Sequence, residues 1–314
     1  METPRENPTV HFLHTPRRGP PEDLIRGYAH YLLSLINCDR LPVSLNAIRK
    51  RLGLTVYRKP LPGLRGCTNP ALTIYVNSDD RLAVQKFSAA HELFEVLFFA
   101  IRDDVAADWM DDNLFTGLME RKEALCEMGA AELTMPLPLF SDLIGQHPVC
   151  LDAAKEAATL CGVSLTATIY RIIDLGLAAK ALVICQHKHK PLDRFPSRVG
   201  QGNLFGTPEF MDAEKKMRII RSFVPPDFVG YIPHEKSIPC TSLIQCAFDE
   251  GVIVSGTDYF NVGDLRGRYY VEATPFRIDD ERHVMALVHL DRPDTCRPRT
   301  LGDWAAYKLP MRAS

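Results

Sequence analysis

An apolar stripe at helical spacing is the clearest pattern in the first third of the chain. Its members recur at steps of three and four residues: Phe87, Ala90, Phe94, Leu97 and Ile101. This spacing follows one face of an α-helix, so we predict a helix from about Asp80 to Ile101. Three polar residues, His91, Glu92 and Glu95, interrupt its apolar surface.

Shorter elements are predicted before this helix. One helix opens at Pro21 and carries apolar residues at helical spacing as far as Leu35. A second begins after Ser44, a good helix cap, and ends at Gly53. The runs 54–57 and 72–76 are rich in β-branched and aromatic residues, which predicts strands. Residues 1–20 are rich in proline, and we expect them to be disordered.

Helical segments return after residue 112. We predict one helix from about Leu118 to Leu133, because Met135-Pro136 then ends it. Two more helices are expected in 152–175 around Gly162 and Ser164, since the glycine can end one helix and the serine can cap the next. Residues 191–206 shift to Pro, Gly, Arg and Asn, which is typical of a linker or a long surface loop.

The last third predicts a second mixed domain, with strands at 228–232, 251–255, 268–273 and 284–290 and a helix near 241–249. Helices and short sheets that follow each other in blocks indicate an α+β fold in both halves. We therefore divide the chain into five segments: a disordered start (1–20), a first domain (21–145), a two-helix segment (146–185), a linker or loop (186–206) and a second domain (207–314).

Composition and charge exclude some classes of partner. Lys and Arg total 37 against 39 Asp and Glu, so the net charge of −2 gives no overall attraction to nucleic acid or to an anionic membrane. The first residues lack the apolar core of a signal peptide, and no apolar run is long enough to span a bilayer. We therefore expect a cytoplasmic protein without a membrane partner. Nine cysteines without a C-x-x-C pair predict reduced, mostly buried thiols.

His91 and Glu95 are candidate metal ligands, because residues four apart lie one turn above each other on a helix and can point at a single ion. Glu92 lies about 100° further round the helix, where a carboxylate can take a proton from a metal-bound water without ligating the metal. A catalytic site needs a third protein ligand. The candidates are Glu120, Glu123 and Glu127 on the predicted helix 118–133, and His147 in a later loop.

A purely structural reading of the same residues stays open. H-E-x-x-E fixes only three letters, and a histidine among carboxylates on a helix is usually solvated or hydrogen-bonded. Without an ion, however, Glu95 and Glu123 would face each other with only His91 to neutralise them, which charge repulsion opposes. We therefore expect an ion, or a shared proton, between these side chains.

Two separated motifs resemble the ImmA/IrrE family of metallo-endopeptidases. The first is Asn77-Ser78 followed by Lys86-Phe-Ser-Ala-Ala-His-Glu-Leu93, which is similar to the family's strand ending I-N-S and its helix R-F-T-L-A-H-E-L-G-H. The second runs Glu123-Ala-Leu-Cys-Glu-Met-Gly-Ala-Ala-Glu-Leu-Thr-Met-Pro136 and is similar to E-x-x-A-N-x-F-A-A-x-L-L-M-P. The order and spacing of the motifs match over about residues 24–180.

The resemblance implies a zincin-like metallopeptidase domain with a small sheet, a helix-turn-helix-like segment at 146–185 and a GAF-like α+β domain at 207–314. It implies that His91 and Glu123 hold a divalent metal, zinc first, and that Glu92 is the general base. Helix spacing adds Glu95 to these ligands, and its second carboxylate makes manganese the other option. The implied partner is a protein substrate, an XRE-type repressor, whose cleavage switches on stress or mobile-element genes.

Three residues depart from the family pattern: Glu95 replaces the second histidine, Phe94 replaces a glycine, and Glu127 stands where asparagine is common. Two anionic ligands favour harder ions such as manganese and make a bound water a weaker acid. Phe94 is predicted to pack in the core, and Glu127 to be solvated or to support a ligand. The alternative function is a regulatory binding protein on a degenerate peptidase scaffold. Direct DNA binding is disfavoured because 146–185 shows no basic face.

Overall fold

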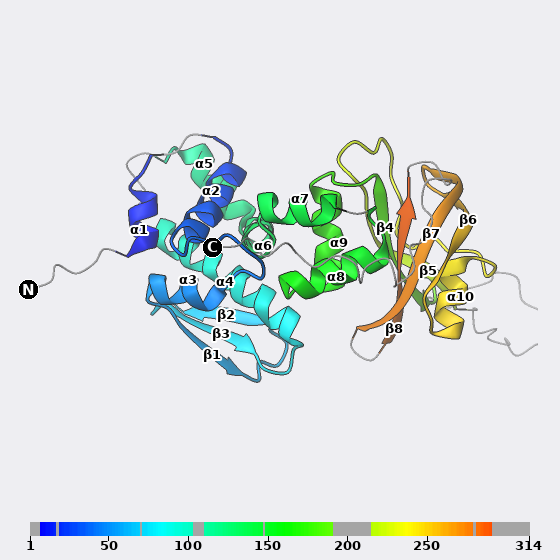
Figure 1. Cartoon of the computed structure of the whole chain (residues 1–314), viewed down its shortest axis with the longest axis horizontal. Helices are drawn as coiled ribbons and strands as arrows, with labels where there is room; N and C mark the ends of the chain where they lie inside the picture. The colour runs from blue at the N-terminus through cyan, green and yellow to red at the C-terminus, as the bar shows by residue number, and fades with distance from the viewer. Residues whose placement is uncertain are drawn as a thin grey trace, which may run out of the picture. The chain divides into compact units, whose positions relative to one another are not determined.

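The computed structural model describes residues 7–16, 19–69, 71–102, 110–146, 148–190, 215–278 and 281–290, which form two compact units. Unit 1 comprises Met1–His147 with Asp152–Arg171, and unit 2 comprises Pro148–Leu151 with Ile172–Ser314. Figure 1 labels the helices and strands of both. Unit 1 combines helices with a small sheet and unit 2 is built on a larger sheet, so the predicted α+β class is confirmed.

Unit 1 contains most of the helices. In chain order its elements are α1 (Pro8–Leu13), α2 (Pro21–Ser34), α3 (Leu45–Leu52), β1 (Thr55–Lys59), β2 (Gly66–Asn69), β3 (Thr73–Asn77), α4 (Leu82–Arg102), α5 (Asp112–Glu120), α6 (Lys122–Thr134), α7 (Leu137–Gly145) and α8 (Leu151–Cys161), and α9 (Leu165–Asp174) runs from unit 1 into unit 2. Helices α2, α3, α8 and α9 confirm the predicted ones. The Ser44 side chain caps α3 by accepting a hydrogen bond from Ala47 N at 3.3 Å, and Gly53 ends it in a left-handed conformation.

The sheet of unit 1 has the strand order β1-β3-β2. β1 runs parallel to β3 and β2 runs antiparallel to it, so β2 is an outer strand. β1 and β3 confirm the strands predicted at 54–57 and 72–76. The prediction misses β2, because Gly66-Cys-Thr-Asn69 is short and contains glycine and asparagine, which are depleted in strands.

Helix α4 is the central helix of unit 1. It contacts α1, α3, α6 and the strands β2 and β3, and Figure 1 shows it lying against the sheet. Its apolar stripe is buried from Ala90 onward, with Ala90, Phe94 and Leu97 fully inaccessible to solvent, while Phe87 is half-buried. The polar side chains of α4 are therefore held on a helix that the core fixes in place.

Residues 8–13 form α1, so the prediction of disorder through residue 20 is wrong for this segment. Phe12 is buried in the core of unit 1, and its ring centroid lies 5.1 Å from that of Tyr28 on α2. Proline richness hides this helix from sequence reasoning because Pro8 stands in its first turn, where proline is tolerated.

The helix predicted at 118–133 is in fact two helices, α5 and α6, which meet at Arg121. This residue has φ −112° and ψ 14°, outside helical geometry, and its guanidinium pairs with Glu22 of α2 at 2.6 Å. Arg121 forms no side-chain hydrogen bond that would cap the start of α6. The residues around the break are all good helix formers, so the local sequence does not reveal it.

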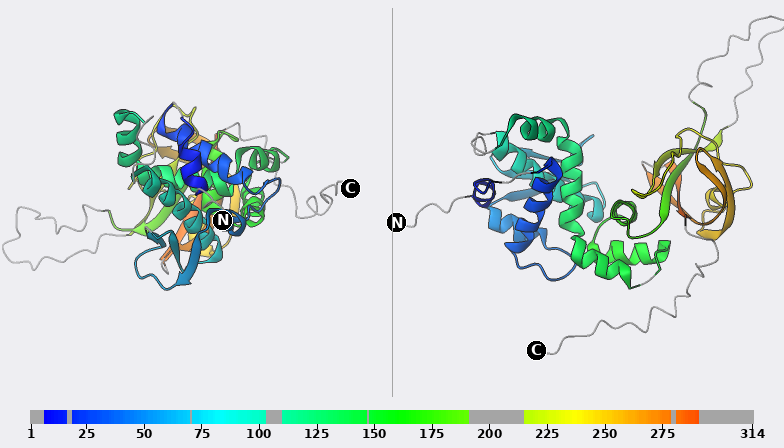
Figure 2. Two further views of the ribbon diagram at one scale, coloured as in Figure 1. Left: turned by 90° about the vertical axis from the view of Figure 1, so that its left-hand side faces the viewer. Right: turned by 90° about the horizontal axis from the view of Figure 1, so that it is seen from above.

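The described residues of unit 2 form a five-stranded antiparallel sheet with a helix against it. Its elements are β4 (Lys180–Lys188), β5 (Lys216–Phe223), α10 (Leu243–Glu250), β6 (Val254–Val262), β7 (Leu265–Ile278) and β8 (Glu281–His289), and the strand order is β5-β4-β8-β7-β6. Helix α10 contacts β6, β7 and β8, and Figure 2 shows the sheet curving around it. The apolar side chains between the helix and the sheet form the core of this unit.

Two predictions for unit 2 need correction. The sheet begins well before residue 207, because residues 180–186 of β4 pair with β8. The strand predicted at 228–232 does not form, since the backbone N–H of Tyr231 donates to the Asp264 carboxylate at 2.7 Å instead of to a neighbouring strand. Strands β6, β7 and β8 and helix α10 confirm the remaining elements, with shifted ends.

Some predictions concern residues that the structure does not describe. The linker predicted at 186–206 lies outside the described ranges from residue 191 onward, and so does His147. Within those ranges, no helix is both long and apolar enough to cross a membrane. Their eight cysteines are all free thiols, as the sequence predicts.

A buried ion pair joins α6 to α9 within unit 1. Glu132 and Arg171 are both at most 4% exposed, and Arg171 Nη2 donates to Glu132 Oε2. Arg171 Nε also donates to the backbone carbonyl of Met135 at 3.3 Å, while the backbone N–H of Leu137 donates to Glu132 Oε1. Removing one partner of such a pair leaves the other charge buried without compensation.

We therefore expect Arg171→Met to lower the free energy of unfolding of unit 1 by about 3–5 kcal/mol. Urea denaturation followed by far-ultraviolet circular dichroism measures this change. The matched control is Lys155→Met, which breaks an exposed pair with Asp152 on α8 and should cost less than about 1 kcal/mol. Equal costs for the two variants would contradict the argument.

Candidate metal centre

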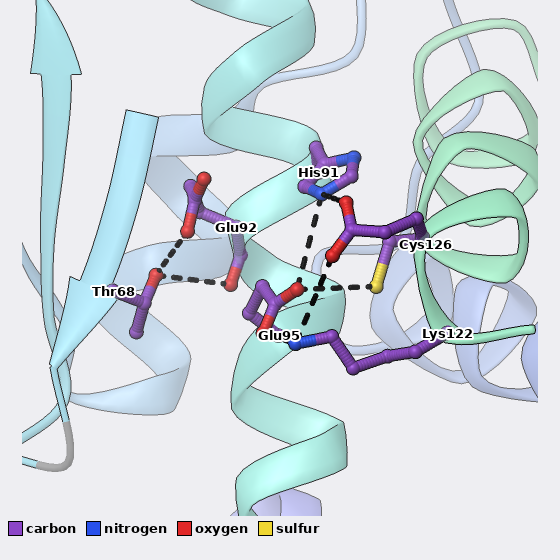
Figure 3. A network of polar contacts seen from close by, with 7 residues as sticks. Thr68, His91, Glu92, Glu95, Lys122 and Cys126 are labelled. Carbon is purple, nitrogen blue, oxygen red and sulfur yellow. Dashed lines mark hydrogen bonds and ion pairs between the residues drawn. The ribbon is translucent and has the colours of Figure 1, made fainter. Parts of the chain in front are cut away.

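Helix α4 directs its polar residues to two different sides. Figure 3 shows Glu92 on the side that faces β2, whereas His91 and Glu95 lie on the side that faces α6. His91 and Glu95 occupy successive turns, and their side chains are 19% and 13% exposed. His91 and Glu95 thus share one face of α4 and Glu92 lies further round the helix, as the sequence spacing predicts.

Glu92 is held against the sheet. Thr68 Oγ1 on β2 donates to Glu92 Oε2 at 2.7 Å, and a side chain at Gly66 would come within 2.8 Å of Glu92 Oε1. Burial raises the pKa of Glu92 to about 7, the Thr68 hydrogen bond opposes this shift, and the charges of Glu95 and Glu123 add to it. Glu92 is thus a carboxyl group that can both accept and release a proton near neutrality.

Five side chains meet where α4 packs on α6: His91, Glu95, Lys122, Glu123 and Cys126, here termed the α4–α6 cluster. His91 Nε2 lies 3.9 Å from Glu95 Oε1 and 3.6 Å from Glu123 Oε2. Cys126 Sγ donates to Glu95 Oε1 at 3.8 Å. The structure therefore brings together the three ligands that the sequence predicts, and adds a thiol and an ammonium group to them.

Lys122 neutralises the carboxylates of the cluster. Its Nζ lies 2.8 Å from Glu95 Oε2 and 3.9 Å from Glu123 Oε1. Burial alone would lower the pKa of Lys122, but the hydrogen bond and charge of Glu95, together with Glu123, outweigh burial and raise it. The expectation that only His91 could neutralise the two glutamates is wrong, and charge repulsion is no argument for an ion here.

The donor set of the cluster nevertheless fits a divalent metal. Ligand atoms of a tetrahedral zinc ion lie about 3.4–3.6 Å apart, and the 3.6 Å and 3.9 Å separations around His91 Nε2 are equal to or slightly longer than this. The ligand atoms of His91, Glu95 and Cys126 all lie within 4.8 Å of one another. Lys122 hydrogen-bonds Oε2 of Glu95 and leaves Oε1 facing His91 and Cys126.

Sequence reasoning missed Cys126 and Lys122. Only Cys126 had a signal, because it lies one turn after Glu123 on α6 and so on the same face of that helix. The other carboxylate candidates on the predicted helix, Glu120 and Glu127, are exposed, which agrees with a solvated Glu127.

Phe94 packs in the core as predicted and does not enter the cluster. Its ring is fully buried and lies edge-on to Tyr28, with centroids 5.6 Å apart. A Cβ added to Gly129 on α6 would meet this ring at 2.4 Å. In the motif quoted above, phenylalanine stands at position 129 and glycine at position 94. Relative to that motif, the phenylalanine has moved from α6 to α4 and the glycine from α4 to α6. The exchange conserves the side-chain volume between the two helices.

The cluster lies next to solvent at the start of α6. A pocket of about 470 Å³ is lined by residues 119–124, which include Lys122 and Glu123. Glu123 is 77% exposed, whereas Cys126 is fully buried. The α4–α6 cluster therefore has a wet end at Glu123 and a dry end at Cys126.

Comparison with known proteins places this site in a family context. Residues 49–172 match the family model described as Peptidase_M78, the IrrE N-terminal-like domain. The chain is similar to "Radiation response metalloprotease IrrE" of Deinococcus deserti, with 30% identity over 134 residues, 42% of this chain and 47% of the relative. The protein of the same name from Deinococcus radiodurans is 25% identical over 124 residues, 40% of this chain and 38% of the relative. The chain thus spans less than half the length of either relative.

A solved structure shares the fold over a longer stretch. The "Mycobacterium tuberculosis transcriptional regulator" superposes with a TM-score of 0.55 and covers 84% of this chain and 75% of its own. The sequence identity is 14%, so this likeness concerns the fold alone.

The contact between Phe94 and Gly129 predicts an unusual response to Gly129→Ala. Alanine normally stabilises a helix interior by about 0.5–1 kcal/mol relative to glycine, but here overpacking should destabilise by about 1–3 kcal/mol. Urea denaturation measures the change, and Phe94→Leu in the same chain should recover part of the loss. Gly145→Ala is the control, since nothing lies within 4 Å of an added Cβ there. A stabilising Gly129→Ala would refute the close packing.

Proposed function

Because residues 49–172 belong to the IrrE N-terminal-like domain family of the ImmA/IrrE metallopeptidases, we propose that this protein is an intracellular metal-dependent endopeptidase. We propose that it cleaves a helix-turn-helix repressor of the XRE type and thereby regulates a stress or mobile-element response. One observation carries the proposal: α4 and α6 bring His91, Glu95 and Glu123 together, with Glu92 on the adjoining side of the same helix.

His91, Glu95 and Glu123 would hold the divalent ion, zinc first and manganese as the other option. When bound there, the ion supplies Lewis acidity toward the scissile carbonyl and toward the attacking water. Nε2 of His91 and Oε1 of Glu95 are the ligand atoms that point toward one another, and Lys122 holds the second oxygen of Glu95.

Glu92 would be the general base. Its carboxylate takes a proton from the attacking water and later gives it to the amine of the departing peptide, a shuttle that suits a pKa near neutrality. The hydrogen bond from Thr68 fixes the carboxyl group beside β2. The outer edge of β2 could accept an extended peptide by strand addition, which would bring the scissile bond close to Glu92.

Unit 2 would supply regulation. Its antiparallel sheet with α10 is the part of the chain for which the sequence predicts a GAF-like fold, and we propose that it responds to a signal that controls cleavage. The segment 146–185, predicted to be helix-turn-helix-like, would then dock the substrate instead of reading DNA.

The test is cleavage of an XRE-type repressor encoded beside the gene, incubated with the purified protein and added zinc, manganese, cobalt or iron. We expect cleavage by the wild type and at least a 100-fold loss in Glu92→Gln, because the general base is removed while the metal ligands stay. The control is Gln146→Glu, which makes the reverse exchange of glutamine and glutamate at an exposed residue. It should leave the cleavage rate unchanged. If no metal supports cleavage and Glu92→Gln equals the wild type, the proposal fails.

A second candidate function rests on Lys122. Its ammonium group already neutralises Glu95 and Glu123, so the α4–α6 cluster is electrostatically satisfied without a metal. We propose as the alternative a regulatory binding protein that keeps the peptidase scaffold and grips its partner without cutting it.

Restoring the histidine separates the two candidates. If the first holds, Glu95→His changes the cleavage rate little or lowers it, because the wild-type site already works with a carboxylate. If the second holds, the wild type is inert and Glu95→His gains cleavage, especially together with Lys122→Met, which removes the competing cation. Repressor cleavage assayed by gel electrophoresis in excess zinc decides, and we expect the first outcome.

A further inference from the structure

Cys126 is the one member of the α4–α6 cluster that the proposed function leaves without a task. It lies at the dry end of the cluster, fully buried, with its sulfur 3.8 Å from the same Glu95 oxygen that faces His91. Its thiol, a carboxylate oxygen of Glu95 and a ring nitrogen of His91 form a set in which every pair of ligand atoms lies within 4.8 Å. Three different donor groups on two packed helices therefore lie around one small space.

Glu123 is much less fixed in place than Cys126, although its Oε2 lies 3.6 Å from His91 Nε2. Its side chain is 77% exposed and stands in the first turn of α6. One of its oxygens lies 3.9 Å from Lys122 Nζ, which also holds Glu95. Ordering an exposed glutamate costs side-chain entropy, whereas the buried Cys126 side chain is already fixed by packing.

We propose that the metal ligands of this chain are His91, Glu95 and Cys126, with Glu123 on the open side where the fourth position stays accessible. This inference rests on the proposed function, because it keeps the metal at the same site and replaces Glu123 by Cys126 in the ligand set given there. Binding of the ion as M²⁺ would replace the thiol proton, which passes to solvent, and form one metal–thiolate bond without any change of oxidation state.

The cysteine would offset the loss of the second histidine in H-E-x-x-E. In the motif quoted above, alanine stands at position 126, which offers no ligand. A thiolate selects zinc or cobalt over manganese, whereas a ligand set of one histidine and two carboxylates shifts the preference toward manganese. The identity of the third ligand therefore determines which metal the protein takes.

Cobalt titration of the metal-free protein tests the ligand set directly. A cysteine ligand gives cobalt an intense near-ultraviolet thiolate-to-metal charge-transfer band, which carboxylate ligands do not produce. We expect one equivalent of cobalt to produce this band in the wild type and in Glu123→Gln. Cys126→Ala should abolish the band and weaken zinc binding, measured by competition with a chelating dye, by more than about 100-fold, since loss of supporting groups alone costs 10–100-fold.

Two controls keep the result interpretable. Cys161→Ser removes a different buried thiol of unit 1 and should keep the band. Cys126→Ala carries the residue of the family motif and should therefore fold, which circular dichroism verifies.

Each outcome has one meaning. Stoichiometric cobalt binding without the band, or a band that survives in Cys126→Ala, overturns the cysteine ligand while the proposed metallopeptidase stands. Loss of binding in Glu123→Gln also overturns it, in favour of the carboxylate set. Failure of the wild type to bind any metal overturns both this inference and the metal-dependent function.

Discussion

The packing of α4 on α6 is the contact on which the site depends. The Phe94 ring lies against the bare backbone of Gly129, so the two helices come close enough for side chains of one to reach those of the other. His91 and Glu95 from α4 can then meet Glu123 and Cys126 from α6. A larger residue at position 129 would push the helices apart. The polar side chains would then no longer meet, although none of them had been substituted.

Much of unit 1 is predictable because its local signals agree with its tertiary structure. The apolar period of α4, the Ser44 cap and the Gly53 stop each act within a few residues. The elements that escape prediction depend on distant partners. β2 exists because it pairs with β3, and α1 is stable because Phe12 reaches Tyr28. Arg121, at the break between α5 and α6, pairs with Glu22, which lies about 100 residues earlier in the chain. Contacts between residues far apart in the chain cannot be predicted from a local sequence pattern.

The candidate site shows the same division between what is local and what is distant. Spacing alone places His91, Glu92 and Glu95 on one helix, and the family resemblance adds Glu123. Neither reveals that Lys122 occupies the space between the carboxylates, because its reach to Glu95 depends on how α6 lies against α4. Neither shows that Thr68 orients Glu92, since β2 itself is not predicted. The chemistry of each residue is thus readable from the sequence, but its protonation and its partners are set by packing.

The uncapped start of α6 has a consequence for how this end of the helix is held in place. The first N–H groups of a helix lack partners within it, and Arg121 supplies no side-chain acceptor to α6. The first turn, which carries Lys122 and Glu123, is therefore held to the rest of unit 1 through side chains: Lys122 pairs with Glu95, and Glu123 lies 3.6 Å from His91. The two residues that balance the charge of the site are thus also the ones that fasten this end of α6 to α4.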